Sequence, residues 1–357
     1  MNELEARLDY PLADAIPSLG RSIVVAPGIK WIRMTLPFAL DHVNIWLMRD
    51  RVDGREGWSV IDCGVANDTT RQAWEDVFAD ELEGLPIVRV VVTHMHPDHI
   101  GLADWLVNRW TVDGHVCRMW ISATDFQVAQ QTNGASSDSL SGPRAADFMA
   151  SHGLVEADSL QKVRERVSYY SALVPAVPRQ YRRLVDGMTV TFGGEHWTCM
   201  VGYGHAPEHM AFFNERMNVL IAGDMVLPRI STNVSVFENE PEGDPLTQYL
   251  DSLDRMRPLP ADCLVLPSHG RPFVGLHTRI DQLHDHHATH FEEVLGACRE
   301  APQCANDLLM LLFKRKLDLH QTTFAMGESI AHLNALWHAG RLTRTKDERD
   351  VWRFAPA

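Results

Sequence analysis

The sequence predicts an α/β fold in which loops at strand ends carry polar side chains. Residues 86–92 form a short apolar run rich in β-branched side chains, which is typical of a buried strand. Three histidines and an aspartate follow at residues 94–99, and residues 100–107 then show the apolar spacing of a helix. Open α/β sheets place their functional sites on such loops, at the carboxyl ends of strands.

The expected elements begin with strands and continue with strands and helices in alternation. Runs of β-branched and aromatic residues predict strands, and apolar residues three to four positions apart predict helices. The expected strands cover residues 22–26, 31–36, 43–48, 58–61, 86–92, 117–122, 188–192, 197–201, 220–223 and 265–267. The expected helices of this part cover residues 70–78, 100–107, 125–131 and 249–256.

Residues 132–186 do not fit this alternation and are interpreted as an inserted helical cap. Polar residues 132–139 predict a loop, and residues 160–167 have helical spacing. Tyr169, Tyr170 and Arg182 also lie in this range. Packing within the cap is the favoured role of these three side chains, and contact with a substrate is the alternative.

The loop at residues 94–99 has the residue types that bind metal ions. Neutral imidazole and carboxylate groups are ligands of zinc-class ions. Along an extended loop, His94 and His96 point the same way and can bind one ion. Asp98 and His99 suit a second ion beside the first. A polar loop that contains these residues by chance is disfavoured, because four residues of metal-binding type lie within six positions.

His94-x-His96-x-Asp98-His99 resembles the HxHxDH motif of the metallo-β-lactamase fold hydrolases. Four further stretches resemble the other motifs of that superfamily in the same order, each at the end of a predicted strand. They lie at residues 58–64, 202–205, 220–224 and 265–270. The resemblance implies a four-layer αββα sandwich as the catalytic domain at residues 1–275, with the helical cap at 132–186 as an insertion.

The resemblance also implies which residues hold two metal ions. One ion would be held by His94, His96 and His205, the other by Asp98, His99 and His269, and Asp224 would bridge the two ions. The expected cofactors are two divalent ions, with Zn2+ favoured and Mn2+ or Fe as alternatives.

Three carboxylates have implied catalytic roles. Asp98 would hold one ion and Asp224 would bridge both, and a water or hydroxide between the ions would be the nucleophile. Asp62 would orient a ligand from outside the metal coordination, as outer carboxylates do. His209 is interpreted as a supporting residue rather than a ligand, because seven ligands are already assigned. Asp41 and His42 are interpreted as a turn, with a contact to the site as the alternative.

Residues 276–357 form a second expected domain. Residues 280–295, 304–316 and 329–337 fit helices, and residues 342–345 and 351–354 fit a hairpin. This order resembles the winged-helix tail on the branch of the superfamily that includes glyoxalase-II-like enzymes and β-lactamase-like protein 2. The histidines at 284–290 are interpreted as polar residues of a domain junction, and a further metal site is the alternative.

The charge balance disfavours nucleic acid as a partner. The chain has 33 Lys and Arg against 47 Asp and Glu, which gives a net charge of −14. Nearly all of this acidic excess lies before residue 276. An acidic protein does not attract phosphate backbones at long range.

The sequence also leads us to expect a cytoplasmic protein without membrane contact. It has no run of eighteen apolar residues, and its acidic start lacks the pattern of a signal peptide. Six cysteines are scattered without metal-binding spacing, which favours reduced thiols.

Together these features favour a dinuclear hydrolase of a carboxylic thioester, ester or lactone, with a small-molecule acyl substrate. The acidic chain, the apolar and aromatic cap and the lack of a basic arm favour this function. The alternative is a metal-dependent RNA or DNA phosphodiesterase of the endoribonuclease type, which the winged-helix resemblance favours. A one-iron dioxygenase and a binding protein with a vestigial site are further alternatives. The C-terminal domain is expected to serve in forming a homodimer.

Overall fold

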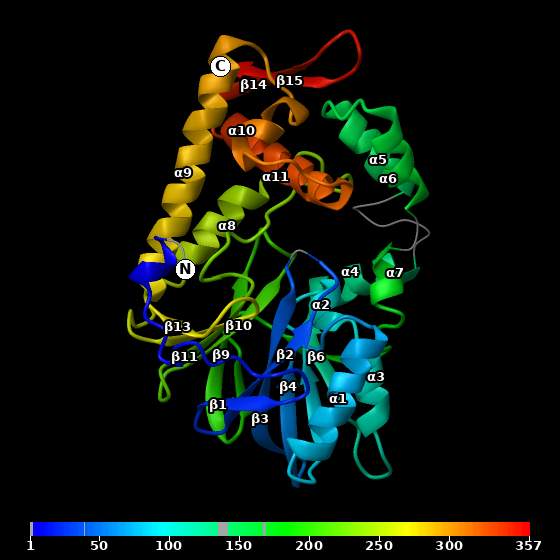
Figure 1. Cartoon of the computed structure of the whole chain (residues 1–357), viewed down its shortest axis with the longest axis vertical. Helices are drawn as coiled ribbons and strands as arrows, with labels where there is room; N and C mark the ends of the chain where they lie inside the picture. Colours follow the sequence, from blue (N-terminus) through cyan, green and yellow to red (C-terminus); the bar gives the residue numbers. More distant parts are fainter. Residues whose placement is uncertain (1–2, 39, 135–141, 167–168) are drawn as a thin grey trace.

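Two β-sheets packed face to face form the centre of the computed structural model, which describes residues 3–38, 40–134, 142–166 and 169–357 (Figure 1). The first sheet contains, in spatial order, β1 (Ser22–Ala26), β2 (Ile29–Thr35), β3 (His42–Val52), β4 (Arg55–Ile61), β5 (Ile87–Val91), β6 (Arg118–Ser122) and β7 (Tyr181–Leu184). Strands β1 to β4 are antiparallel neighbours, and β4 to β7 run parallel.

The second sheet contains, in spatial order, β13 (Phe273–Val274), β12 (Leu264–Pro267), β11 (Val219–Gly223), β10 (His209–Asn214), β9 (Glu195–Gly202) and β8 (Thr189–Phe192). Strands β11 and β12 are parallel, and the other neighbours are antiparallel. Strand β10, in which every residue is buried, was not among the strands expected from the sequence.

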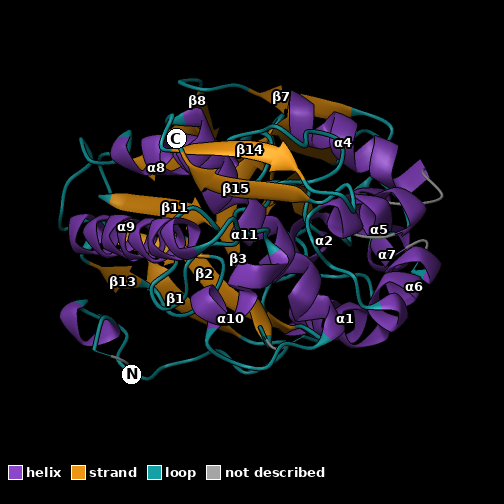
Figure 2. Ribbon diagram, turned by 90° about the horizontal axis from the view of Figure 1, so that it is seen from above, coloured by secondary structure: helices purple, strands orange, loops and turns teal. Residues whose placement is uncertain are grey.

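Helices cover the outer faces of both sheets, so the predicted four-layer αββα sandwich is confirmed (Figures 1 and 2). The first sheet is covered by α1 (Asp68–Asp80), α3 (Ala103–Trp110) and α4 (Ala123–Gly134), and the second by α8 (Pro245–Asp254) and α9 (Leu276–Glu300). Between the sheets, Ile61 and Trp46 of the first share one buried cluster with Phe212 and Trp197 of the second. Each buried Ile or Phe stabilises the fold by about 1.5–3 kcal/mol.

The cap consists of α5 (Gly142–Ser151), α6 (Ala157–Glu165) and α7 (Tyr169–Leu173). Residues 135–139 of the expected polar loop and residue 167 of the expected helix lie outside the described residues. The cap was expected at residues 132–186. The end of this range is not helical, because β7 joins the first sheet as an edge strand. Arg182 therefore lies on a strand, with its guanidinium 4.4 Å from the ring centroid of Trp120.

The C-terminal part contains α9, α10 (Leu309–Phe313), α11 (Leu319–His338) and the hairpin of β14 (Leu342–Lys346) and β15 (Trp352–Pro356). The expected hairpin is present, and the winged-helix resemblance stays a prediction. Helix α11 begins well before the expected residue 329, because Asp318 and Gln321 form a capping box. The expected helix at 304–316 is only the short α10, preceded by a 3-10 turn at Asn306–Leu308.

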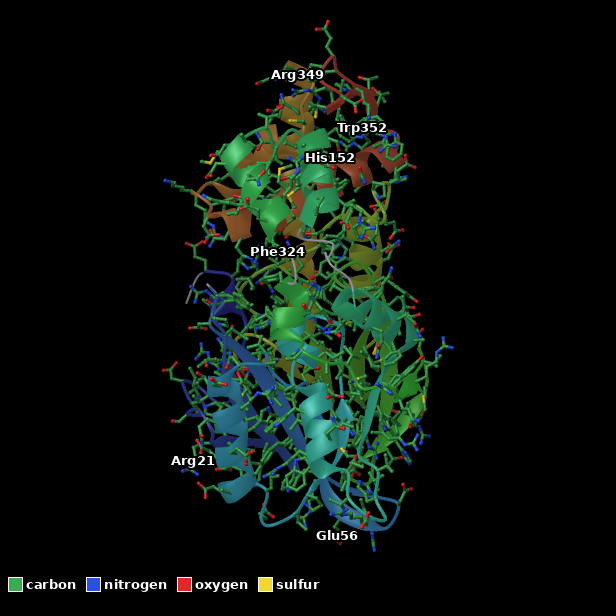
Figure 3. The ribbon with its side chains drawn as sticks, turned by 90° about the vertical axis from the view of Figure 1, so that its right-hand side faces the viewer. Arg21, Glu56, His152, Phe324, Arg349 and Trp352 are labelled. Atoms are coloured by element: carbon green, nitrogen blue, oxygen red, sulfur yellow. The ribbon has the colours of Figure 1, made fainter. Side chains whose placement is uncertain are left out.

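The C-terminal part and the cap share a hydrophobic core with the second sheet. Ile280 of α9, Ile330 of α11 and Met149 of the cap belong to the same buried cluster as Leu220 of β11. Figure 3 shows His152 of the cap and Trp352 of the hairpin in the upper half, with Arg21 and Glu56 at the opposite end. No helix of the described residues is long and apolar enough to cross a membrane. The six cysteines all lie in the described part and are buried, free thiols.

Candidate metal centre

Five strands end at the side of the sandwich that faces α7 and α11 (Figure 1). Asp62 follows β4, the loop that begins with His94 follows β5, and His205 follows β9. Asp224 comes directly after β11, and His269 follows β12. The fold therefore gathers the polar loops of both sheets at a single place.

The first group of side chains consists of His94, His96 and His205, whose ligand nitrogens lie within 4.8 Å of one another. His94 Nε2 lies 2.9 Å from His96 Nδ1 and 3.2 Å from His205 Nε2. His205 Nδ1 donates to the backbone carbonyl of Asn233 at 2.8 Å. In the neutral ring, this bond leaves His205 Nε2 unprotonated and directed at the other two histidines.

His94 is held in the same tautomer by Thr93. The Thr93 hydroxyl donates to Asp62 Oδ2 at 2.9 Å, so it can accept from His94 Nδ1 at 3.0 Å. The lone pairs of His94 Nε2 and His205 Nε2 then face each other at 3.2 Å. A cation between the two nitrogens would turn this repulsion into ligation.

The second group consists of Asp98, His99 and His269, whose ligand atoms also lie within 4.8 Å of one another. The short helix α2 (Pro97–Ile100) carries Asp98 and His99. Asp98 Oδ2 lies 3.4 Å from both His99 Nε2 and His269 Nε2. The outer nitrogen of His99 donates to Asp62 at 2.7 Å, and that of His269 to the His42 carbonyl at 2.7 Å.

Asp224 lies between the two groups. Its Oδ2 is 3.3 Å from His205 Nε2 of the first group and 3.4 Å from His269 Nε2 of the second. Its Oδ1 is 3.6 Å from His99 Nε2. This is the place that a ligand shared by two ions would occupy.

The donor set fits two divalent ions. In a tetrahedral site with bonds of about 2.0–2.2 Å, neighbouring ligand atoms are about 3.3–3.6 Å apart, and most distances given above are close to this. His99 Nε2 and Asp224 Oδ1 are buried, and among the described residues neither has a hydrogen-bond partner. The structure brings all seven expected ligand residues together, and their roles as ligands stay a prediction.

The electrostatics of the two groups differ, and both favour a cation. Burial lowers the pKa of His94 well below its ordinary value and that of His96 to about 3, so both rings are neutral, as ligation requires. Burial also acts to lower the pKa of His99, but Asp98 and two further aspartates outweigh it and raise this pKa well above its ordinary value. The excess negative charge that holds a proton on His99 would equally hold a divalent ion.

Asp62 organises the loop after β5. Its Oδ1 accepts from the Thr93 amide at 2.8 Å, and its Oδ2 accepts from the Thr93 hydroxyl and from His99 Nδ1. Asp62 adopts a φ of 67°, a left-handed conformation that is uncommon for a residue with a side chain. This turn directs the carboxylate beneath the histidine loop.

Two supporting contacts come from backbone carbonyls. Asn233 and His42 each bind the outer nitrogen of a histidine, as described above for His205 and His269. The His42 ring also accepts from the amide of Gly270 at 2.8 Å. The contact with the site that was the alternative for His42 is therefore present.

Three buried side chains hold the metal loops from behind. Asp125 Oδ1 accepts from the Met95 amide at 2.9 Å, and the Tyr170 hydroxyl donates to the Met95 carbonyl at 2.6 Å. His209 Nε2 accepts from the Asp224 amide at 3.0 Å, which is a supporting contact. Tyr170 thus joins the cap to the loop between His94 and His96.

Comparison with known proteins places this geometry in a family. The sequence model of the metallo-beta-lactamase superfamily matches residues 39–269, and that of the metallo-beta-lactamase-like C-terminal domain matches residues 291–357. The probable metallo-hydrolase YqjP of Bacillus subtilis (strain 168) is 26% identical over 311 residues, which cover 85% of this chain and 91% of that protein.

Two further proteins are similar to this chain. A linear primary-alkylsulfatase from Pseudomonas sp. is 24% identical over 229 residues, which cover 63% of this chain and 41% of that protein. The crystal structure of a beta-lactamase domain protein from Burkholderia ambifaria has 49% identity and a TM-score of 0.94, with 100% of both chains covered. Because the superfamily match spans well over half of the sequence and includes the loops that build the candidate centre, this chain belongs to the metallo-beta-lactamase superfamily and is a metal-dependent hydrolase.

Proposed function

We propose that this protein hydrolyses a carboxylic thioester, ester or lactone of a small acyl molecule, with two divalent ions, preferably Zn2+, at the candidate centre. The observation that carries the proposal is a set of aromatic side chains where three parts of the chain meet beside the centre. The set consists of Phe38 from the β2–β3 loop, Tyr169 from the cap, and His320 and Phe324 from α11.

The His320 ring contacts each of the other three rings. The rings of Phe38 and His320 are stacked with centroids 5.4 Å apart, and the Phe324 and Tyr169 rings lie 4.9 Å and 5.9 Å from His320. Phe324 lies at the junction between the upper part of the molecule and the sheets (Figure 3). Tyr169 precedes Tyr170, whose hydroxyl binds the metal loop. Tyr169 of the aromatic set is thus the chain neighbour of a residue that contacts the loop of the candidate centre.

The described residues show one cation in contact with these rings. This cation is Arg166, with its guanidinium 3.8 Å from the Tyr169 ring centroid and 3.2 Å from His320 Nδ1. Binding a phosphodiester chain relies on several Lys and Arg side chains that neutralise phosphates. Aromatic rings instead bury the apolar hydrocarbon chain of a ligand. They therefore suit an uncharged acyl group. This surrounding supports an acyl substrate over a polyanion.

The residues of the centre have distinct tasks in such a reaction. Two divalent ions, when bound, supply a nucleophile from water at neutral pH and polarise the carbonyl of the substrate. Asn233 and His42 keep His205 and His269 in the tautomer that leaves the inner nitrogen free for ligation. Asp62 does the same for His99, and burial among these side chains excludes bulk water.

The test described below includes two other classes of substrate, phosphodiesters and alkyl sulfates. A phosphodiesterase remains the second candidate, because the C-terminal part has helices followed by a hairpin, the order that resembles a winged helix. Alkyl sulfates are included because one relative is named a linear primary-alkylsulfatase. Alkyl sulfates and acyl thioesters both carry a hydrocarbon chain next to the ester group that is hydrolysed.

The first test compares substrates on protein that has been dialysed against a chelator and then reloaded with Zn2+, Mn2+ or Fe2+. We expect thiol release from acyl thioesters by reloaded protein, loss of this activity after chelation, and loss in Asp98→Ala. The same protein is assayed for sulfate release from alkyl sulfates and for cleavage of single-stranded RNA. Metal-dependent RNA cleavage without thioester turnover would contradict the acyl-hydrolase proposal and favour the second candidate.

Tyr169→Ala tests the aromatic set. We expect the KM for a long-chain acyl substrate to rise about 2- to 10-fold, because an aromatic contact contributes about 0.5–1.5 kcal/mol. Metal content and kcat should change little, since Tyr169 is not among the residues of either metal group. Arg182→Ala is the matched control, because Arg182 stacks on Trp120 at the sheet edge. Loss of metal in Tyr169→Ala, or the same KM change in Arg182→Ala, would contradict this role.

A further inference from the structure

Helices α9 and α11 both belong to the C-terminal part (Figure 1), and together they supply a second cluster of metal-ligand side chains, made of residues other than those of the candidate centre. His286 and His290 are four residues apart on α9, so they project from the same face of the helix. Glu328 comes from α11. One ligand atom from each of these three residues lies within 4.8 Å of the others.

One ring nitrogen of each histidine in this cluster has no hydrogen-bond partner among the described residues. His286 Nε2 and His290 Nδ1 are buried, and neither has a hydrogen-bond partner among the described residues. His290 is 9% exposed and Glu328 is 7% exposed. A buried polar atom without a partner costs about 1–3 kcal/mol, so two such nitrogens beside a buried carboxylate require an explanation.

The charge states also suit a cation. Burial lowers the pKa of His286 to about 4 and also lowers that of His290, so both rings are neutral near pH 7. Burial raises the pKa of Glu328 to about 7, although a hydrogen bond from Asn233 at 3.2 Å opposes this shift. A metal site binds its ion when its histidines are neutral and its carboxylate is ionised. The two neutral imidazoles and a carboxylate without a cationic partner meet these needs.

Two neighbouring histidines contact each other, although His287 Nε2 is also buried and without a hydrogen-bond partner among the described residues. His332 Nδ1 donates to the Glu328 backbone carbonyl at 2.8 Å, so in the neutral ring its Nε2 is an acceptor. His287 Nδ1 lies 3.2 Å from His332 Nε2 and donates to it. Lys314, whose charge acts on His290, is paired with Glu293 at 2.7 Å. Of the histidines on these two helices, only His286 and His290 have ligand nitrogens within 4.8 Å of each other and of a Glu328 oxygen.

We propose that His286, His290 and Glu328 bind an additional divalent ion of the zinc class, separate from the two ions of the catalytic centre. Two imidazoles and one carboxylate are a zinc-class donor set, whereas Ca2+ and Mg2+ prefer oxygen ligands alone. Three protein ligands leave a fourth position for water, and His286 is only partly buried, so an ion can enter from that side.

An ion at this place fixes α11 against α9. It also acts on the catalytic centre, because Glu328 accepts a hydrogen bond from Asn233, whose carbonyl binds His205. The additional site thus lies two hydrogen bonds from a predicted ligand of the first catalytic group. This connection gives the C-terminal part a role in positioning His205, whichever bond the enzyme cleaves.

Anomalous diffraction on the wild-type protein tests the proposal directly. Crystals are grown from metal-free protein that has been reloaded with Zn2+ alone, and data are collected above and below the zinc edge. We expect an anomalous peak between His286, His290 and Glu328 in addition to density at the catalytic centre. Peaks at the catalytic centre with none between these three side chains would overturn the proposal.

Metal counting in variants tests it independently of activity. His286→Gln and His290→Gln are each expected to bind one equivalent of Zn2+ fewer than the wild type. His284→Gln is the matched control, because His284 lies on the same helix and contacts Asp254 at 3.1 Å rather than the cluster. Equal stoichiometry in the wild type and all three variants would overturn the proposal. A failed acyl-hydrolase assay would leave both measurements unaffected.

Discussion

Asp224→Ala is expected to lower turnover by about 10³-fold or more, which corresponds to about 4 kcal/mol of lost transition-state stabilisation. Asp224 contacts His205 of the first group at 3.3 Å and His269 of the second at 3.4 Å. Asp98, by contrast, contacts two members of the second group. Loss of Asp224 therefore removes a negative charge from both predicted ion positions at once.

The protein should stay folded in this variant, because the bond that holds residue 224 in place is made by its backbone. The Asp224 amide donates to His209 Nε2, and alanine keeps that donor. The measurements are kcat/KM, bound metal by mass spectrometry and the thermal unfolding midpoint. Asp262→Ala is the control, since Asp262 is an exposed carboxylate that binds Asn218. Full turnover with two ions bound in Asp224→Ala would refute its assignment as the bridging ligand.

The sequence predicted the strands and loops that carry ligands because their signals are local. Residues 86–92 are apolar and β-branched, and the histidines follow within the same loop, so strand, turn and donors appear together in the sequence. Strand β10 was not predicted, because residues His209–Asn214 include no β-branched side chain. The early start of α11 could have been predicted, because Asp318 and Gln321 have capping-box spacing.

Asp62 and His209 were predicted as supporting residues, but the contacts made by backbone carbonyls could not be predicted from sequence, for a physical reason. Asn233 and His42 act on the histidine rings through backbone carbonyls, which every residue has. Their positions lie 28 residues from His205 and 227 residues from His269, so only the folded chain brings them together. The same holds for Glu328, which reaches Asn233 across 95 residues.

Asp62→Ala is expected to weaken metal binding about 10- to 100-fold, the usual cost of losing an outer partner of a ligand histidine. The carboxylate is almost fully buried and accepts from His99 Nδ1, from the Thr93 amide and from the Thr93 hydroxyl. Without it, the buried His99 and Thr93 donors lose their acceptor, at about 1–3 kcal/mol for each unsatisfied group. His99 would also lose the bond that selects its tautomer. Thermal stability should fall together with metal affinity.

The metal dependence of turnover separates this positioning role from ligation. If Asp62 only orients His99, excess Zn2+ should restore most of kcat in Asp62→Ala, whereas Asp224→Ala should stay inactive at every metal concentration. Asp50→Asn is the matched control, because Asp50 is a buried carboxylate on β3 that pairs with Arg89 at 3.1 Å. It should lose stability while its metal affinity stays that of the wild type. Metal affinity lowered equally in Asp50→Asn and Asp62→Ala would mean that general destabilisation, rather than the orientation of His99, explains the effect.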